Sequence, residues 1–289
     1  LGQWLARRAA VPNGAIILAP PAVSTTLCYH ADLRGIASLS WENKEGMGAA
    51  IRVAISTSRD ETHALCQRRE LNYLVLPTWD TFFEPFVESA SVQVGSLFLP
   101  SVQRWIVPPW LRPVPYEMPR IPGFENHAVV VFEMVEDQDE PVALSRLTEY
   151  FIEMSQAQVI AQSLRKFPAD FGALVARAQL ESALGEREAF AETVDTLLKR
   201  LASGGDRFLP FDRRVSLATV LARAQRFDQA RTQVQRCLTG LDEAAIRSLT
   251  PYALFHFLGL CKGFGMPIPD EHLRGVALEV LPLNLRSQL

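Results

Sequence analysis

The 289-residue sequence lacks several motifs that mark common functional classes. No apolar run approaches the roughly 18 residues that a membrane helix needs, and no signal peptide is visible. Neither G-x-G-x-x-G nor a Walker sequence is present, and no G-x-S-x-G nucleophile elbow occurs. We therefore predict a chain that does not itself span a membrane and that carries no identifiable catalytic residue.

Motifs that bind metals are missing as well. The four cysteines, Cys28, Cys66, Cys237 and Cys261, form no CxxC pair, and no two histidines have the i, i+4 spacing of a zinc-binding helix. We predict no metal and no cofactor. Because two cysteines fall in each half of the chain, the sequence allows either one disulfide per domain or buried free thiols.

The net formal charge is −3 and the hydrophobic fraction is 48%. This composition supports a folded core and gives no basic footprint, so nucleic acid is excluded as an expected partner. The length fits two domains, and the pattern changes near residue 140. Strand and helix patterns alternate before this point, and helical periodicity follows it. We predict an α/β domain over residues 1–140 and an all-α domain over residues 141–289.

Four apolar runs in the first domain have the length of strands. They cover residues 14–19, 36–39, 73–76 and 127–135, and helical stretches begin at Asn43 and Asp60. Strands that alternate with helices pair in parallel through right-handed crossovers. We therefore expect a mostly parallel sheet in a three-layer domain, with the last strand at an edge.

Prolines and aromatic residues are concentrated in residues 99–124. Seven prolines occur in this segment, together with Trp105 and Trp110. Because proline interrupts helices and central strands, we predict an extended surface segment whose aromatic side chains are fixed to the domain beneath it.

The second domain contains an internal repeat. Aligning residues 171–185 with residues 211–225 matches Ala178 with Ala218, and each unit reads as helix, tight turn, helix. Further helices are expected at residues 142–153, 156–167, 251–262 and 270–280. The pattern resembles a tetratricopeptide-type solenoid, which implies a concave surface that binds a protein partner.

The turn after the first strand is one candidate binding site. Ser24, Thr25 and Thr26 place hydroxyl groups near the expected start of a helix, at the sheet edge where open α/β domains bind ligands such as phosphates. Capping of this helix by Ser24 or Thr25 explains the same residues.

A second candidate site comes directly after the third strand. The Trp79 indole offers a stacking face for a sugar ring, and the Asp80 carboxylate accepts hydrogen bonds from sugar hydroxyls. Asp80 equally fits the cap of a helix that begins at Thr81.

The order of motifs in residues 1–80 resembles a known group of proteins. The motifs are Pro-Asn-Gly-Ala-Ile-Ile-Leu-Ala-Pro at 12–20, Leu-Cys-Tyr-His at 27–30, Trp-Glu-Asn at 41–43 and Leu-Asn-Tyr-Leu-Val-Leu at 71–76. They resemble the soluble C-terminal part of bacterial polytopic membrane glycosyltransferases of the GT-C type. That group includes dolichyl-mannose mannosyltransferase-like enzymes and oligosaccharyltransferase catalytic subunits.

The resemblance implies membrane helices upstream of this chain and an extracytoplasmic (periplasmic) location. It places the catalytic acid outside the fragment and implies a carbohydrate or lipid-linked sugar as partner of the parent chain. The start at Leu1, without methionine, fits a fragment. The Trp-Trp-Asp acceptor motif of the oligosaccharyltransferases is absent, since residues 20–23 read Pro-Pro-Ala-Val.

From these features we predict a non-catalytic, extracytoplasmic, soluble portion of a membrane glycosyltransferase-like protein, whose helical repeats serve protein interaction or assembly. Two alternatives stay open. One is a free-standing soluble enzyme or binding protein for a nucleotide or sugar phosphate, and the other is a cytoplasmic solenoid adaptor.

Overall fold

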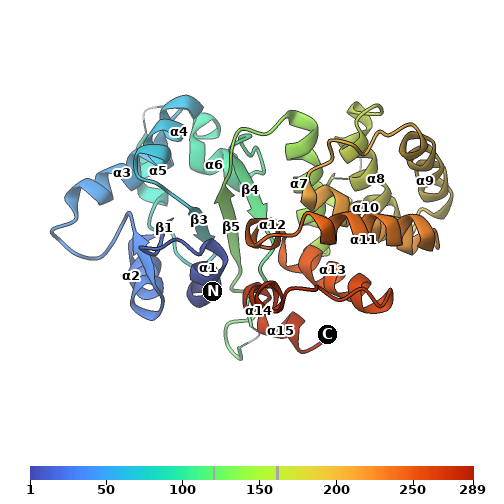
Figure 1. Cartoon of the computed structure of the whole chain (residues 1–289). Helices are drawn as coiled ribbons and strands as arrows, with labels where there is room; N and C mark the ends of the chain where they lie inside the picture. The colour runs from blue at the N-terminus through green and yellow to red at the C-terminus, as the bar shows by residue number, and fades with distance from the viewer. Residues whose placement is uncertain (91, 120, 161–162) are drawn as a thin grey trace. The chain divides into compact units, whose positions relative to one another are not determined.

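The computed structural model describes residues 1–90, 92–119, 121–160 and 163–289. The chain forms two compact units, Leu1–Gln138 and Asp139–Leu289. The first unit, blue to green in Figure 1, contains a sheet and helices, and the described part of the second contains helices alone. The chain is thus a mixed α/β unit followed by a helical unit.

The α/β unit is built on a five-stranded mixed sheet with the strand order β2-β1-β3-β5-β4. The strands are β1 (Ala15–Leu18), β2 (Leu33–Gly35), β3 (Tyr73–Pro77), β4 (Leu111–Val114) and β5 (Val129–Met134). β1 runs parallel to β2 and β3, whereas β5 runs antiparallel to β3 and β4. Parallel pairing is therefore confined to three strands. The edge position expected for residues 127–135 is wrong, because β4 pairs with the outer side of β5.

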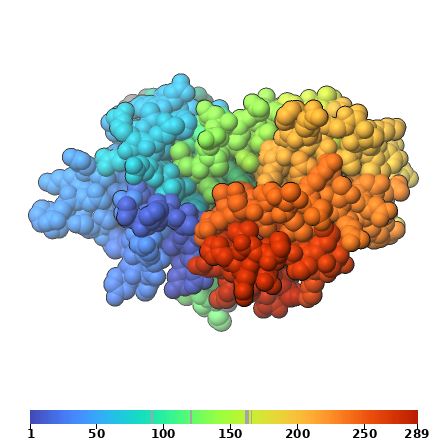
Figure 2. All heavy atoms as spheres, viewed as in Figure 1, coloured from blue at the N-terminus to red at the C-terminus, as the bar shows by residue number. Residues whose placement is uncertain are grey.

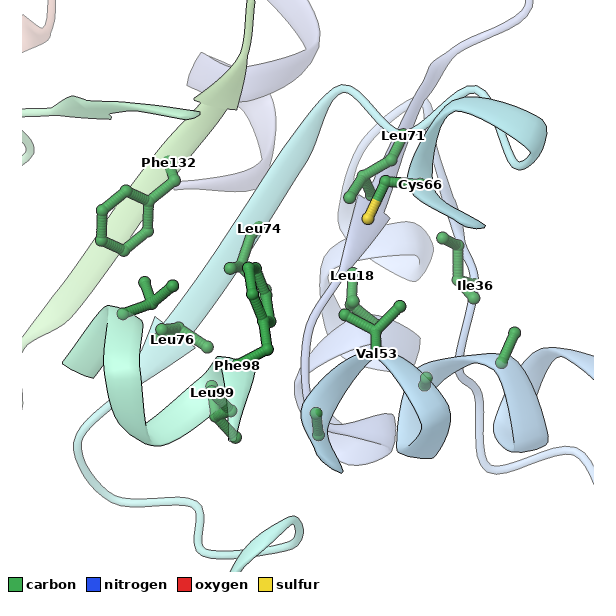
Figure 3. Packing of buried hydrophobic residues seen from close by; sticks show 14 of the residues in the cluster. Leu18, Ile36, Val53, Cys66, Leu71, Leu74, Leu76, Phe98, Leu99 and Phe132 are labelled. Atoms are coloured by element: carbon green, nitrogen blue, oxygen red, sulfur yellow. The ribbon is translucent and has the colours of Figure 1, made fainter. Parts of the chain in front are cut away.

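Helices cover both faces of this sheet. They are α1 (Gly2–Ala9), α2 (Pro21–His30), α3 (Lys44–Ile55), α4 (Arg59–Arg68), α5 (Glu84–Ser89) and α6 (Phe98–Gln103). Successive strand residues point to opposite faces, so Ile16 and Leu18 pack with α3, α4 and α6, while Ala15 and Ile17 pack with α1 and α2. Figure 3 shows the first of these two clusters, where side chains of the sheet and of α3 and α6 converge. Burial on both faces explains the uninterrupted apolar runs of the strands.

The second strand lies earlier than expected, at β2 instead of residues 36–39. The Ile36 N–H donates to the Ile17 carbonyl at 2.9 Å, and the Ile36 carbonyl accepts from Asn43 Nδ2 at 2.9 Å. Because this side chain takes the carbonyl, the ladder ends and the chain turns into α3. Asn43 also caps α3, since its Oδ1 accepts from the Gly46 N–H at 3.1 Å. Figure 2 shows the start of α3, in light blue, at the left margin of the unit.

The proline-rich segment 99–124 contains regular structure, contrary to expectation. It begins inside α6, where Pro100 occupies the first turn and therefore removes no intrahelical hydrogen bond. It also contains β4, in which Pro113 is tolerated because one side of an edge strand stays unpaired. Trp110 is only 3% exposed and belongs to the core between the sheet and α6.

The helical unit consists of packed helix pairs. Its α-helices are α7 (Glu140–Glu153), α8 (Phe171–Leu184), α9 (Arg187–Ala202), α10 (Phe211–Arg223), α11 (Phe227–Thr239), α12 (Glu243–Ser248), α13 (Pro251–Gly263), α14 (Glu271–Val280) and α15 (Leu283–Arg286). α8 packs along α9 and α10 along α11, and α10 also contacts α8 and α13. Ala178 and Ala218 are fully buried in these contacts, where a small side chain allows close approach.

The connections between these helices differ in length. Gly185, at φ 75°, ends α8 and makes a tight turn into α9. The helix expected at residues 156–167 is replaced by two 3-10 turns, Ala157–Ile160 and Ser163–Lys166, and positions 161 and 162 lie outside the described residues. A longer connection, residues 203–210, joins α9 to α10. Among the described residues, no helix combines the length and the apolar character needed to cross a bilayer.

Candidate functional site

The carboxyl ends of β1 and β3 form one rim of the sheet, and both loops singled out in the sequence lie there. Pro20, after β1, and Asp80, after β3, line a common cavity of about 60 Å³ with side chains of α5 and α6. Small-molecule sites usually measure roughly 300–1,000 Å³. The structure thus brings the two loops together around a cavity too small for a nucleotide.

The three hydroxyl residues lie inside α2, which begins at Pro21. Each hydroxyl donates to a backbone carbonyl four or five residues earlier, at 3.1 Å for Ser24, 2.8 Å for Thr25 and 2.9 Å for Thr26. Thr25 Oγ1 also accepts from the Leu39 N–H at 3.0 Å. No side chain caps the N-terminus of α2, so the hydroxyls bond back to carbonyls of the preceding turn instead of capping the helix, and Thr25 also fixes the loop at Leu39.

Trp79 and Asp80 lie in the loop after β3. The Trp79 ring is 41% exposed and meets the His127 ring edge-on at 5.1 Å, and His127 lies 5.0 Å from the ring of Phe124. Asp80 Oδ1 accepts from the Phe82 N–H at 3.0 Å. This bond closes a turn ahead of α5, so Asp80 does not cap a helix directly after it.

A larger cavity, of about 730 Å³, lies in the helical unit at the connection between α9 and α10. Its wall is formed by Ser203, Gly204, Asp206, Arg207, Phe208, Arg214 and Arg236. Gly204, at φ 78°, and the bond from the Gly205 N–H to the Arg200 carbonyl at 2.9 Å terminate α9. Phe208 is 90% exposed. We call this site the basic cavity.

Asp206 is the centre of the charged lining. Its carboxylate accepts from Arg214 Nη1 at 3.2 Å and from Gln233 Nε2 at 3.1 Å, and it pairs with Arg236 Nη1. Arg214 is held in place by further bonds of 2.9 Å to the Asp206 carbonyl and to Gln233 Oε1. The side chain of Asp206 is 5% exposed, whereas that of Arg236 is 52% exposed. Arg207 also lines the cavity, so three arginines and one aspartate give the lining a formal charge of +2.

A second hollow, of about 340 Å³, adjoins the basic cavity. Its α9 side consists of Leu198, Leu201 and Ala202, and its α11 side of Gln229, Thr232, Gln233 and Arg236. Because Arg236 lines both, the hollow and the basic cavity are contiguous; only the α9 side of the hollow is apolar.

Another charged group is buried inside the helical unit. Arg213, from α10, pairs with Glu149, from α7, and Ser216 Oγ donates to the same carboxylate at 2.6 Å. Burial favours the neutral form of Arg213, but the Glu149 and Asp212 carboxylates outweigh burial and raise the pKa of Arg213 above its ordinary value. Because Arg213 is 1% exposed, we interpret this group as a structural link between two helices.

Sequence reasoning missed the basic cavity. Asp206 comes from the connection between α9 and α10, Arg214 from α10 and Arg236 from α11, and the packing of α10 on α11 brings them together. One signal was present, because Gly204 and Gly205 mark the longer connection between the two helix pairs.

The described residues offer no metal site, and the cysteines are unpaired. Among the described residues, no group of three or more His, Cys, Asp or Glu could hold a metal ion. All four cysteines are free, and Cys66, Cys237 and Cys261 are buried, which decides between the two alternatives left by their spacing. The chain matches no protein-family model and no curated protein, and no solved structure matches it.

Proposed function

We propose that the chain is a non-catalytic binding portion of a larger protein and that its helical unit binds a partner protein at the basic cavity. The observation that carries this proposal is a cavity of about 730 Å³ in which guanidinium groups stand beside the exposed Phe208 ring. Arginine and aromatic residues, phenylalanine included, are enriched in protein interfaces. The charge is local, since residues 139–289 contain 18 Lys+Arg and 18 Asp+Glu.

Site-specific photocrosslinking tests this proposal. A photoreactive phenylalanine analogue replaces Phe208 in the full-length protein, expressed in its native cells, and a matched protein carries the analogue at Phe227. Phe227 is also exposed, at 56%, but lies outside the lining of the cavity. We expect a discrete crosslinked protein from position 208 that is absent from position 227. Identical products from both positions refute the proposal.

We also propose that the parent chain is a membrane glycosyltransferase-like protein of the GT-C type and that this portion lies on the extracytoplasmic (periplasmic) side. The order of motifs in residues 1–80 supports this context, with a carbohydrate or lipid-linked sugar bound by the parent chain. Alkaline phosphatase and green fluorescent protein, each fused after Leu289 of the full-length product, test the location. Phosphatase activity supports it, and fluorescence from the second fusion alone rejects it.

We propose further that the helical unit is a tetratricopeptide-like repeat and that the α/β unit has three layers. α8 and α10 begin at Phe171 and Phe211, and α9 and α11 begin at Arg187 and Phe227, so both helices of a pair recur at the same offset. The parallel pairing of β1 with β2 and β3 and the helices on both sheet faces support the layered arrangement. Hydrogen exchange in which α8–α9 and α10–α11 open as separate units supports the repeat. A single opening step for all four helices contradicts it.

A further inference from the structure

We infer that the basic cavity and the hollow beside it bind an acidic segment of the partner, with two neighbouring carboxylate side chains followed by an apolar side chain. This inference rests on the proposed function and names the chemistry of the partner. It follows from the charge of the cavity, from the way Asp206 is held, and from the apolar wall of α9.

The charge of the lining determines the sign and the number of the ligand's charged groups. Three guanidinium groups against the Asp206 carboxylate leave +2, and two carboxylates neutralise this charge. Arg207 is exposed, and Arg236 directs Nη1 to Asp206 while half of its side chain is exposed. A guanidinium has five N–H donors, so the solvent side of Arg236 presents donors to a second carboxylate.

Asp206 shows that the arginines of this cavity already bind a carboxylate. Two guanidinium groups, of Arg214 and Arg236, hold this planar group within hydrogen-bonding distance. A planar carboxylate matches the planar guanidinium fork, and the resulting bonds are charge-assisted. Gln233 and the Asp206 carbonyl fix Arg214, so one wall of the site is arranged before any ligand binds.

The adjoining hollow selects the side chain next to the two carboxylates. Leu198, Leu201 and Ala202 form its α9 side, and Arg236 lines both this hollow and the basic cavity. An extended peptide advances about 3.3 Å per residue, so the residue after an acidic pair bound at Arg236 lies at this hollow. An apolar side chain there removes apolar surface of α9 from water, which favours binding.

Fluorescence anisotropy of labelled peptides tests the inference on the full 289-residue chain. The probe is fluorescein-Gly-Ser-Glu-Glu-Leu-Ser-Gly with an amidated C-terminus. Two matched peptides carry Gln-Gln-Leu, which removes the charge, and Glu-Glu-Gly, which removes the apolar side chain. We expect saturable binding of the probe, about tenfold weaker binding of each matched peptide, and weakening by added salt.

Variants locate the site. Arg236→Gln should weaken binding of the probe by about tenfold, because it removes a charged donor from both cavities. Arg231→Gln, on the same helix and outside both linings, should leave binding unchanged. Both side chains are substantially exposed, and Asp206 keeps Arg214 and Gln233 as partners, so the fold should tolerate either change.

Four results overturn the inference. These are no saturable binding of the acidic probe, equal binding of the Glu-Glu and Gln-Gln peptides, equal effects of the two arginine variants, and displacement of the probe by inorganic phosphate at concentrations where acetate has no effect. The proposed function is judged separately. A discrete crosslink from position 208 without binding of the acidic probe leaves partner binding standing and rejects only the acidic segment.

Discussion

Gly46 and Gly48 lie two residues apart in α3, and replacing each by alanine should change stability in opposite directions. At Gly48, nothing lies within 4 Å of the position that a Cβ would occupy. Alanine there reduces the backbone freedom of the unfolded chain without a steric penalty. We expect Gly48→Ala to stabilise the α/β unit by about 0.5–1 kcal/mol.

At Gly46 the same substitution meets the backbone. A Cβ would collide with the Ile36 carbonyl oxygen and with the Asn43 amide group, whose Nδ2 lies 2.7 Å from the Cβ position. Displacing Asn43 removes the α3 cap, which costs about 1–2 kcal/mol, and leaves the Ile36 carbonyl without its partner, which costs about 1–3 kcal/mol. After the gain in helix propensity, we expect Gly46→Ala to destabilise by about 1–4 kcal/mol.

Urea unfolding followed by tryptophan fluorescence measures both effects. All five tryptophans lie before residue 139, so their emission reports on the α/β unit alone. Circular dichroism at 222 nm, a wavelength sensitive to helix, follows both units together and serves as the control. A Gly46→Ala protein as stable as the unchanged chain, or equal shifts for both variants, would refute the account of Asn43 and Ile36.

Three further predictions concern buried groups. Glu149→Leu leaves the buried Arg213 without its nearest carboxylate and should lower the free energy of unfolding in urea by about 3 kcal/mol. Adding Arg213→Met should recover most of this loss. A double variant as unstable as the single one would contradict the argument. Burial lowers the pKa of His256 to about 4. The unfolded imidazole binds its proton near pH 6.5, so the stability due to the neutral ring is complete above that pH and falls by up to about 3 kcal/mol as the pH drops toward 4. His256→Phe should weaken this acid dependence of the urea midpoint, and an unchanged dependence would exclude His256 as its source. Burial raises the pKa of the Cys66 and Cys237 thiols to about 12. Both thiols should therefore resist a thiol-reactive disulfide in the native protein and react after unfolding, which mass spectrometry can measure. Rapid labelling of the native protein would disprove their burial.

Local patterns in the sequence were sufficient to predict several elements. The strands at residues 14–19 and 73–76 correspond to β1 and β3, because continuous apolar runs of this length suit strands covered on both faces. The helix that begins after Asn43 is α3, because an asparagine can close the first turn through its own side chain. The offset between the two aligned segments reappears in the starts of α8 and α10, since helical periodicity is carried by nearby residues.

Contacts between residues far apart in the sequence decided the sheet topology and the role of Ser24. The sheet is mixed because β5 runs antiparallel to β3, with Leu74 opposite Phe132, and β4 then pairs with β5; no local pattern encodes these pairings. Likewise, Ser24 looked like a cap or a phosphate ligand until the start of α2 directed its hydroxyl to the Ala19 carbonyl. The acceptor available to a short polar side chain depends on where the backbone places it, and backbone placement is settled by packing.

The basic cavity is the clearest case of a feature set by tertiary structure. Its arginines, at positions 207, 214 and 236, form no motif in the sequence. Their spacing does not indicate that they line one cavity. The sequence determined that the second half folds into helices rich in arginine. Only the packing of α10 against α11 and the course of residues 203–210 placed Arg214 and Arg236 around Asp206, because electrostatic attraction acts over distances in space and not along the chain.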